Sequence, residues 1–327
     1  MVASTWPKTL QEAVVYFSNP ETAHAEMVRF RWPDGIVRCP TCGSERVWFT
    51  AARRVWQCAE KHPQRQFSVK VGSIMEDSPL GIDKWLIAAW LITNAKNGIS
   101  SYELGKAIGI TQKSAWFMLH RIRLAMHDDS VDMFKGHIEA DETFIGGKAR
   151  NMHADKRERL KGKKGRSTAG KVAVMGLLER HSESGRSRVR TKIVPNTKRY
   201  ALQSEIRARV ELDGQSTLYT DAFKSYITNA QWRPSDLYIH KVIDHAEAYA
   251  KGNVHTNGLE NFWSLVKRML RGTYVSVEPF HLFRYLDEQC FRFNNRKMSD
   301  SARFAITAGS VFGKRLTFNQ LTAADAR

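Results

Sequence analysis

Residues 253–274 constrain the fold of this chain more than any other stretch. At about 100° per residue, the apolar side chains of this stretch fall on one broad arc of a helix. They are Leu259, Phe262, Trp263, Leu265, Val266, Met269 and Leu270. Glu260, Ser264, Lys267 and Arg271 are spaced so that they return to the opposite face. The sequence therefore predicts an amphipathic helix that presents one carboxylate followed by cations.

Two interpretations of this helix stay open on the residues alone. In a structural one, Asn257 and Glu260 form an N-cap and N3 pair, Lys267 and Arg271 are a solvated face, and Gly272 ends the helix. In a functional one, the acid binds a metal ion and the cations behind it hold a phosphate backbone.

Charge favours the functional interpretation. Among 327 residues, 51 Lys and Arg stand against 33 Asp and Glu, a net charge of +18. This excess favours polyanions, above all nucleic acid. A membrane is not expected as a partner, because no apolar run approaches the ~20 residues of a membrane span and no signal peptide opens the chain.

The four cysteines do not make a disulfide framework for a chain of this size, and three lie within 20 residues of one another. Such clustering indicates a metal site in a reducing, cytoplasmic compartment. Cys39, Cys42, Cys58 and His62 form a Cys3His set that suits Zn²⁺, with expected strands at 47–49, 55–58 and 66–71. We therefore expect a zinc ribbon over residues 36–75. The alternative is three reduced structural cysteines and a surface histidine.

Helical patterns flank the ribbon. Residues 1–35 form a helical segment that Pro20 divides into two short helices, and residues 79–130 form a second helical region. Within it, a turn at Gly109 and an N-cap at Thr111 fit a helix-turn-helix. Gln112 and Lys113 then lie at the front of the recognition helix as DNA-contacting candidates. An ordinary helical hairpin is the alternative.

From residue 135 the periodicity becomes that of strands. Five strands, one helix and the helix described first predict an α/β domain with a mixed sheet over residues 135–300. The expected strands are 137–147, 171–178, 189–194, 216–221 and 238–243, and the added helix is 197–211. The basic segment 148–171 is either a solvated tether or a phosphate-binding arm. Residues 301–327 are expected to be a C-terminal tail.

Three acids fall where this sheet can bring them together. Asp141 lies on the first strand, Asp221 ends a later one and Glu260 begins the helix. Clustered carboxylates repel one another unless a hard cation such as Mg²⁺ or Mn²⁺ binds them. Two such ions activate an attacking oxygen and stabilise a leaving oxygen in phosphodiester displacement. Lys267, two turns along the helix, suits a DNA phosphate.

Several short motifs, taken in order, resemble bacterial insertion-sequence transposases of the group related to the eukaryotic Merlin transposons. They are CPTCG at 39–43, FSVKVGS at 67–73, DETFIGGK at 141–148, YTD at 219–221, HTNGLENFWSLVKR at 255–268 and FRFNNR at 291–296. The resemblance implies an RNase H-like core with a DD(E/N)K signature, a divalent metal and no covalent protein–DNA intermediate.

Matched by position, Asp141, Asp221 and Glu260 correspond to the three catalytic acids of that group. Lys267 corresponds to its lysine. Some relatives have Asn at the third position, and the spacing to Lys267 favours Glu260 over the neighbouring asparagines. With Lys267, the adjoining Arg268 and Arg271 are candidates for DNA contact.

The leading hypothesis is a DNA transposase of the bacterial nucleoid. It would bind the terminal inverted repeats of its element and target DNA, and would work as a homo-oligomer on paired ends. A metal-dependent nuclease with the same core is one alternative. The other is a sequence-specific DNA-binding regulator with an inactive core.

Overall fold

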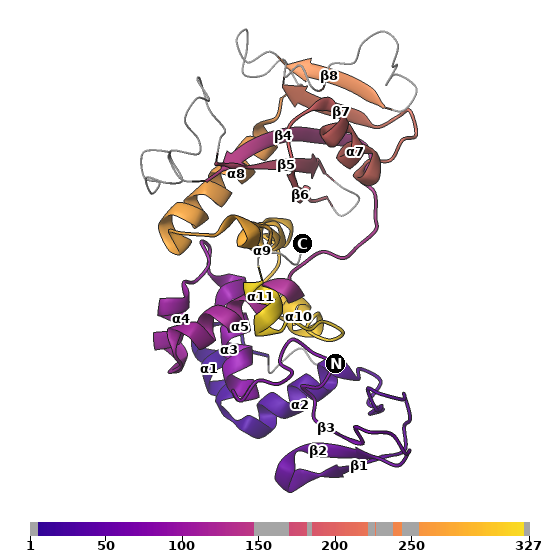
Figure 1. The fold of residues 1–327 in the computed structure, drawn as a ribbon, viewed down its shortest axis with the longest axis vertical. Helices are drawn as coiled ribbons and strands as arrows, with labels where there is room; N and C mark the ends of the chain where they lie inside the picture. The colour runs from indigo at the N-terminus through magenta and orange to yellow at the C-terminus, as the bar shows by residue number, and fades with distance from the viewer. Residues whose placement is uncertain are drawn as a thin grey trace. The chain divides into compact units, whose positions relative to one another are not determined.

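The structure, a computed structural model, describes residues 6–146, 170–181, 185–221, 226, 238–243 and 255–323. The chain divides into two compact units (Figure 1). One unit contains residues 1–127 and 295–327, and the other contains residues 128–294. No helix in the described part is both long and apolar enough to cross a membrane.

Helices make up most of the first unit. α1 (Leu10–Ser18) and α2 (Pro20–Arg31) follow one another, and Pro20 begins α2 where its missing N–H costs nothing. α3 (Ile82–Asn94) comes after the ribbon, and α4 (Ser101–Ile108) and α5 (Gln112–Ala125) follow it. These bounds confirm the expected helices. Gly109 at φ +63° ends α4 and Thr111 caps α5, so the chain turns between them as the sequence predicted.

A three-stranded antiparallel sheet carries the cysteines. It consists of β1 (Val47–Thr50), β2 (Val55–Cys58) and β3 (Gln66–Phe67), with a short 3-10 turn, η1 (Ala51–Arg53), after β1. The strand expected at 66–71 is wrong beyond Phe67. The backbone turns there because the carbonyls of Ser68 and Lys70 accept hydrogen bonds from the amides of Val71 and Ser73.

The end of the chain is not the tail that we expected. α10 (Asp300–Gly309) and α11 (Phe318–Thr322) belong to the first unit, and α10 packs on α3. Phe304 of α10 is fully buried against Trp90 and Phe17. The boundary at residue 300 therefore also differs, because the second unit ends at Asn294.

The second unit is built on a five-stranded mixed sheet with the strand order β6-β5-β4-β7-β8. β4–β5 and β5–β6 are antiparallel, whereas β4–β7 and β7–β8 are parallel. The strands are β4 (His137–Ile145), β5 (Val172–Glu179), β6 (Arg188–Val194), β7 (Thr217–Asp221) and β8 (Ile239–Ile243). The mixed sheet is confirmed.

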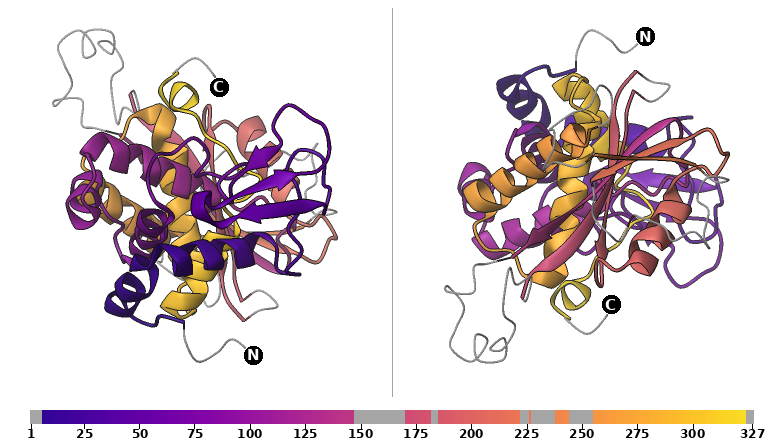
Figure 2. Two further views of the ribbon diagram at one scale, coloured as in Figure 1. Left: turned by 90° about the horizontal axis from the view of Figure 1, so that it is seen from below. Right: turned by 90° about the horizontal axis from the view of Figure 1, so that it is seen from above.

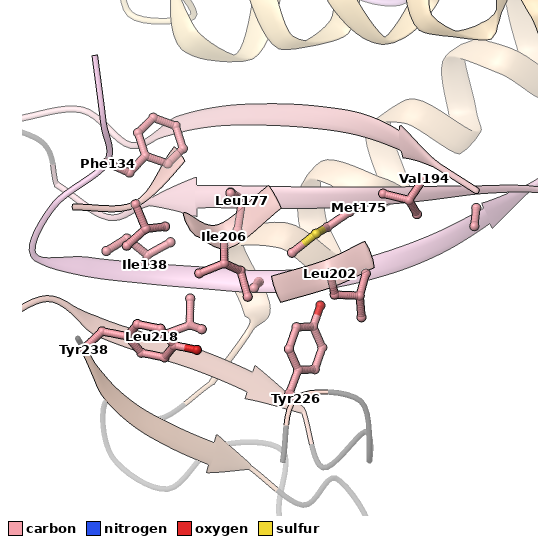
Figure 3. Packing of buried hydrophobic residues seen from close by; sticks show 13 residues of the cluster. Phe134, Ile138, Met175, Leu177, Val194, Leu202, Ile206, Leu218, Tyr226 and Tyr238 are labelled. Atoms are coloured by element: carbon pink, nitrogen blue, oxygen red, sulfur yellow. The ribbon is translucent and has the colours of Figure 1, made fainter. Parts of the chain in front are cut away.

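Helices cover both faces of this sheet (Figure 2). On one face, Leu202 and Ile206 of α7 (Arg199–Arg209) pack on Met175 and Leu177 of β5 (Figure 3). The opposite face, with Val174 and Leu178, is covered by α8 (Asn257–Met269) and α9 (Leu282–Asn294). β5 is thus buried on both sides, which explains its nearly continuous apolar sequence.

The ends of α8 differ in detail from the expectation. Thr256 is the N-cap residue and Asn257 is already helical, so Asn257 is not the cap and Glu260 is not at N3. The regular helix ends at Met269 and a π-helical turn, η4 (Leu270–Tyr274), runs through Gly272. A 3-10 turn, η5 (Pro279–His281), then leads into α9.

Candidate active site and metal-binding cluster

Two of the three acids lie on neighbouring parallel strands. Glu139 of β4 is in register with Tyr219 of β7. Two residues further along each strand come Asp141 and Asp221. Parallel strands in register therefore place the two carboxylates at neighbouring positions of the sheet.

The third acid comes from α8, which packs very closely on the sheet. A Cβ on Gly176 of β5 would lie 2.6 Å from Cζ2 of Trp263 and 2.9 Å from Cδ2 of Leu259. The absence of a side chain at Gly176 thus lets α8 approach the sheet. Glu260, exposed in the first turn of this helix, then faces the pair of aspartates closely enough to affect the ionisation of Asp141.

The ionisation of Asp141 is strongly perturbed. Its pKa is raised from 3.8 to about 6, chiefly by burial and also by the negative charges of Asp221 and Glu260. The indole Nε1 of Trp263 opposes it by donating a 3.0 Å hydrogen bond to Oδ2 of Asp141. Sequence analysis placed Trp263 correctly on the apolar arc but missed this polar role, since periodicity does not report where an indole N–H points.

A fourth carboxyl adjoins the group. The pKa of Glu142 is raised to about 8, chiefly by burial, with the charges of Asp141 and Asp221 adding to the effect and the hydroxyl of Tyr226 opposing it. Tyr226 is itself buried in the core on the α7 side of the sheet (Figure 3). Alternation along β4 could have suggested that Glu142 is buried, but not that its neighbours are acids.

Carboxylate oxygens of like charge are the donor set that Mg²⁺ or Mn²⁺ prefers, so these residues fit such an ion. The carboxylate oxygens of these acids lie farther apart than the ligand atoms of a preformed metal site. Among the described residues, only the cysteine and histidine set has three or more ligand atoms gathered closely enough to hold a metal.

Cations follow Glu260 along the exposed side of α8. Ser264, Lys267, Arg268 and Arg271 are all exposed, while the apolar arc that includes Trp263 faces the sheet. In the part of the chain that the structure describes, no acid pairs with Lys267, Arg268 or Arg271. An anion can therefore approach these side chains directly.

A buried ion pair fastens the start of α8 to β4. Glu139, 1% exposed, accepts a 2.6 Å hydrogen bond from Nε of Arg180 and a 2.9 Å bond from the amide of Leu259. Arg180 also donates to the carbonyl of His255, just before the helix. A Cβ on Gly258 would lie 2.8 Å from Glu139 Oε2. Sequence analysis missed this anchor, because nothing in the spacing of Glu139, Arg180 and Leu259 links them.

The predicted zinc ligands converge in the first unit. The ligand atoms of Cys39, Cys42, Cys58 and His62 all lie within 4.8 Å of one another. Sγ of Cys39 is 3.4 Å from Nε2 of His62, and Sγ of Cys42 is 3.6 Å from Sγ of Cys58. Bond lengths of about 2.0–2.3 Å to a tetrahedral ion would produce separations of this size. The set fits Zn²⁺.

The two candidates on α5 are exposed but have partners. Nε2 of Gln112 donates a 2.8 Å hydrogen bond to Oγ of Ser101, and Nζ of Lys113 lies 5.1 Å from the ring centroid of Phe318. Their side chains would have to leave these contacts in order to reach DNA. The basic segment 148–171 lies almost wholly outside the described residues.

Two known families match the two regions described above. Residues 133–294 match the ISXO2-like transposase domain, and residues 18–62 match the transposase zinc-ribbon domain. The chain belongs to the insertion-sequence transposases. The transposase domain includes all three acids, and the match to the ribbon ends at His62, the fourth member of the zinc-binding set.

One relative of this transposase is an uncharacterised protein in transposable element ISH50 of Halobacterium salinarum. The two are 27% identical over 259 residues, which cover 75% of this chain and 81% of the relative. A search of solved structures finds a simian T-cell lymphotropic virus intasome in complex with PP2A regulatory subunit B56 gamma. That match covers 61% of this chain and 66% of the other at 11% identity, and its TM-score of 0.27 is too low to establish a common fold.

Proposed function

We propose that this transposase cuts DNA at the ends of its insertion sequence and joins the freed 3′-hydroxyl to target DNA. One observation carries the proposal. Within a transposase domain, β4, β7 and α8 carry Asp141, Asp221 and Glu260, and the latter two lie near enough for their charges to act on Asp141. The order of parallel and antiparallel strands supports an RNase H-like core with a DD(E/N)K signature.

The three carboxylates would hold Mg²⁺ or Mn²⁺ through their oxygens. When bound, such ions neutralise the charge of a phosphodiester and activate the attacking oxygen. Trp263 keeps the Asp141 carboxylate in one orientation through its hydrogen bond. Lys267, Arg268 and Arg271 would hold the DNA backbone beside the acids, since charge-assisted bonds to phosphate position a strand without reading its sequence.

The first unit would recognise the element ends. The α4–turn–α5 pair has the connection of a helix-turn-helix, and Gln112 and Lys113 lie at the front of its second helix. The zinc ribbon belongs to the same unit, and a bound metal would stabilise it. Joining two ends requires that both be held together, so we infer a homo-oligomer on DNA.

The test incubates purified protein and Mg²⁺ with a plasmid that carries the gene and its native flanks. Asp221→Asn removes one ligand charge, while Asp213→Asn is the matched control. Asp213 is exposed on the same unit and only caps the amides of Gln215 and Ser216, which an Asn oxygen can also do.

Discrete 3′-hydroxyl cuts at the element ends, present with Asp213→Asn and absent with Asp221→Asn, would support the carboxylate site. Joining of those ends to a second plasmid would distinguish a transposase from a nuclease. Binding without any cleavage would favour a DNA-binding regulator. Equal cleavage by both variants would contradict the assignment of Asp221.

A further inference from the structure

The ribbon sheet has one face that the core does not use. On the inner face, Trp56 and Phe67 are buried and stack on each other. Trp32 contacts both rings edge to face, and the ring of Phe49 lies tilted against Trp56. Residues one position away along a strand point to the other face. The outer face therefore carries Trp48 instead of Phe49, and its indole is 52% exposed.

Three outer-face side chains form a row across the strands. Trp48 of β1 is directly opposite Gln57 of β2, and Gln57 is directly opposite Gln66 of β3. Directly opposite residues share a face and lie about 5 Å apart. Within the described residues, none of these three side chains makes a hydrogen bond or packs against another ring.

Arginines border this row at the turn after β1. Arg53 and Arg54 are exposed, and neither has an acidic partner among the residues that the structure describes. With Gln57 and Gln66, they are among the residues that line an open groove of about 970 Å³, to which Glu76 and Asp77 also contribute. The same ribbon has an arginine that is neutralised, because Arg46 pairs with Glu60 at 2.5 Å.

We propose that this outer face of the ribbon binds duplex DNA in the major groove. Gln57 and Gln66 contact base edges, Trp48 makes the apolar contact, and Arg53 and Arg54 hold phosphates. The proposal rests on the proposed function, since the DNA in question is the element end.

The chemistry of these side chains selects duplex DNA over other occupants. A Gln amide offers the donor and acceptor pair that matches the N7 and N6 edge of adenine, and the thymine methyl accepts an apolar contact. β-strands fit in the major groove, which is about 12 Å wide. The cations without acidic partners complement a phosphate backbone rather than a neutral or basic protein surface.

The experiment measures binding of the full-length, zinc-loaded protein to a labelled duplex of the element end. Binding to a scrambled duplex of equal length is measured for comparison. Mg²⁺ is left out of all binding reactions so that the DNA stays intact. Three variants are measured at several salt concentrations: the double variant Gln57→Ala/Gln66→Ala, the single variant Trp48→Ala and the double variant Arg53→Ala/Arg54→Ala. Gln11→Ala, an exposed glutamine of α1, and Arg46→Ala are the matched controls.

The glutamine pair and Trp48→Ala should each lower the preference for the end over the scrambled duplex, the pair by about tenfold or more. The arginine pair should weaken binding to both duplexes and lower the salt slope by about two. Both controls should bind as the wild type does, and zinc content should stay equal in all variants.

Three results would overturn the proposal. In the first, the preference stays unchanged in the glutamine pair. In the second, the wild-type protein binds the element end no more tightly than the scrambled duplex. This result would leave the proposed transposase activity open, because cleavage in Mg²⁺ is measured in a separate experiment. In the third, Trp48→Ala leaves DNA binding intact but abolishes self-association in sedimentation, and the face is then a contact between copies.

Discussion

At the scale of single residues, the candidate site gathers carboxylates whose negative charges oppose one another's ionisation at Asp141. Asp141 is buried next to two other carboxylates, and its pKa of about 6 means that the folded protein binds this proton more tightly than the unfolded chain does. Stability from this proton is complete below pH ~4 and is lost as the pH rises through about 6.

This conflict predicts a pH dependence in protein that holds zinc but no Mg²⁺. Relative to Asp141→Asn, the wild type should lose at most about 3 kcal/mol of unfolding free energy between pH 4 and pH 7. Added Mg²⁺ should restore stability at pH 8 in the wild type and less in the variant, which lacks one ligand charge. Urea titrations at each pH measure both effects, and parallel curves for the two proteins would contradict the prediction.

A second residue-scale prediction concerns Gly176, where α8 approaches the sheet. Ala at this position would drive a methyl group into the indole of Trp263, so Gly176→Ala should cost about 1–3 kcal/mol by overpacking. Gly272→Ala is the control, because nothing lies within 4 Å of the added Cβ and the residue has no positive φ. Thermal unfolding of the two variants gives the comparison. Equal stability would mean that the helix can shift away from the sheet without cost.

At the scale of elements, α8 depends on the buried anchor at its start. Glu139→Gln keeps an oxygen for the amide of Leu259 but removes the charge that Arg180 needs. We expect a loss of about 1–3 kcal/mol, together with faster amide exchange in the first turn of α8. Cleavage should fall as well, since Glu260 is in that turn.

Glu278→Gln serves as the control for the anchor, because Glu278 is exposed and the structure shows no ion pair for it among the described residues. Exchange rates in α8 measured by mass spectrometry would separate the two variants. Unchanged exchange in Glu139→Gln would show that apolar packing alone fixes the start of this helix.

The sequence predicted the positions of helices and strands better than it predicted contacts between residues. Periodicity located α8 and all five strands of the second unit, because each strand or helix buries a face that the pattern of apolar residues reveals. Cysteine spacing located the ribbon for a similar reason, since metal ligands must be close in space. The expected strand beyond Phe67 failed because its alternating residues serve turns whose hydrogen bonds leave no periodic signal.

Contacts between distant residues were the part that the sequence could not supply. The bond from Trp263 to Asp141 and the anchor of Glu139 with Arg180 join positions far apart in the chain. Both contacts form because α8 packs closely on the sheet. This close packing depends on the missing side chains of Gly176 and Gly258. A single sequence contains these glycines but does not reveal what approaches them.

At the scale of the whole molecule, the chain leaves the first unit at residue 127 and returns to it at residue 295. The first unit is therefore complete only after the last residues are made. Sequence analysis took residues 301–327 for a tail. In the structure, the aromatic side chain of Phe304 lies at the centre of a cluster with Trp6, Phe17, Phe30 and Trp90.

The return of the chain predicts a large cost for one substitution near its end. Phe304→Ala should destabilise the first unit by about 3–5 kcal/mol, because the side chain is fully buried and a cavity would remain between α10 and α3. Phe318→Ala, at a ring that is 37% exposed, should cost much less. Urea unfolding gives the free energies, and amide exchange in α3 locates the effect. A cost below about 1 kcal/mol for Phe304→Ala, the range of surface substitutions, would mean that the end of the chain is dispensable after all.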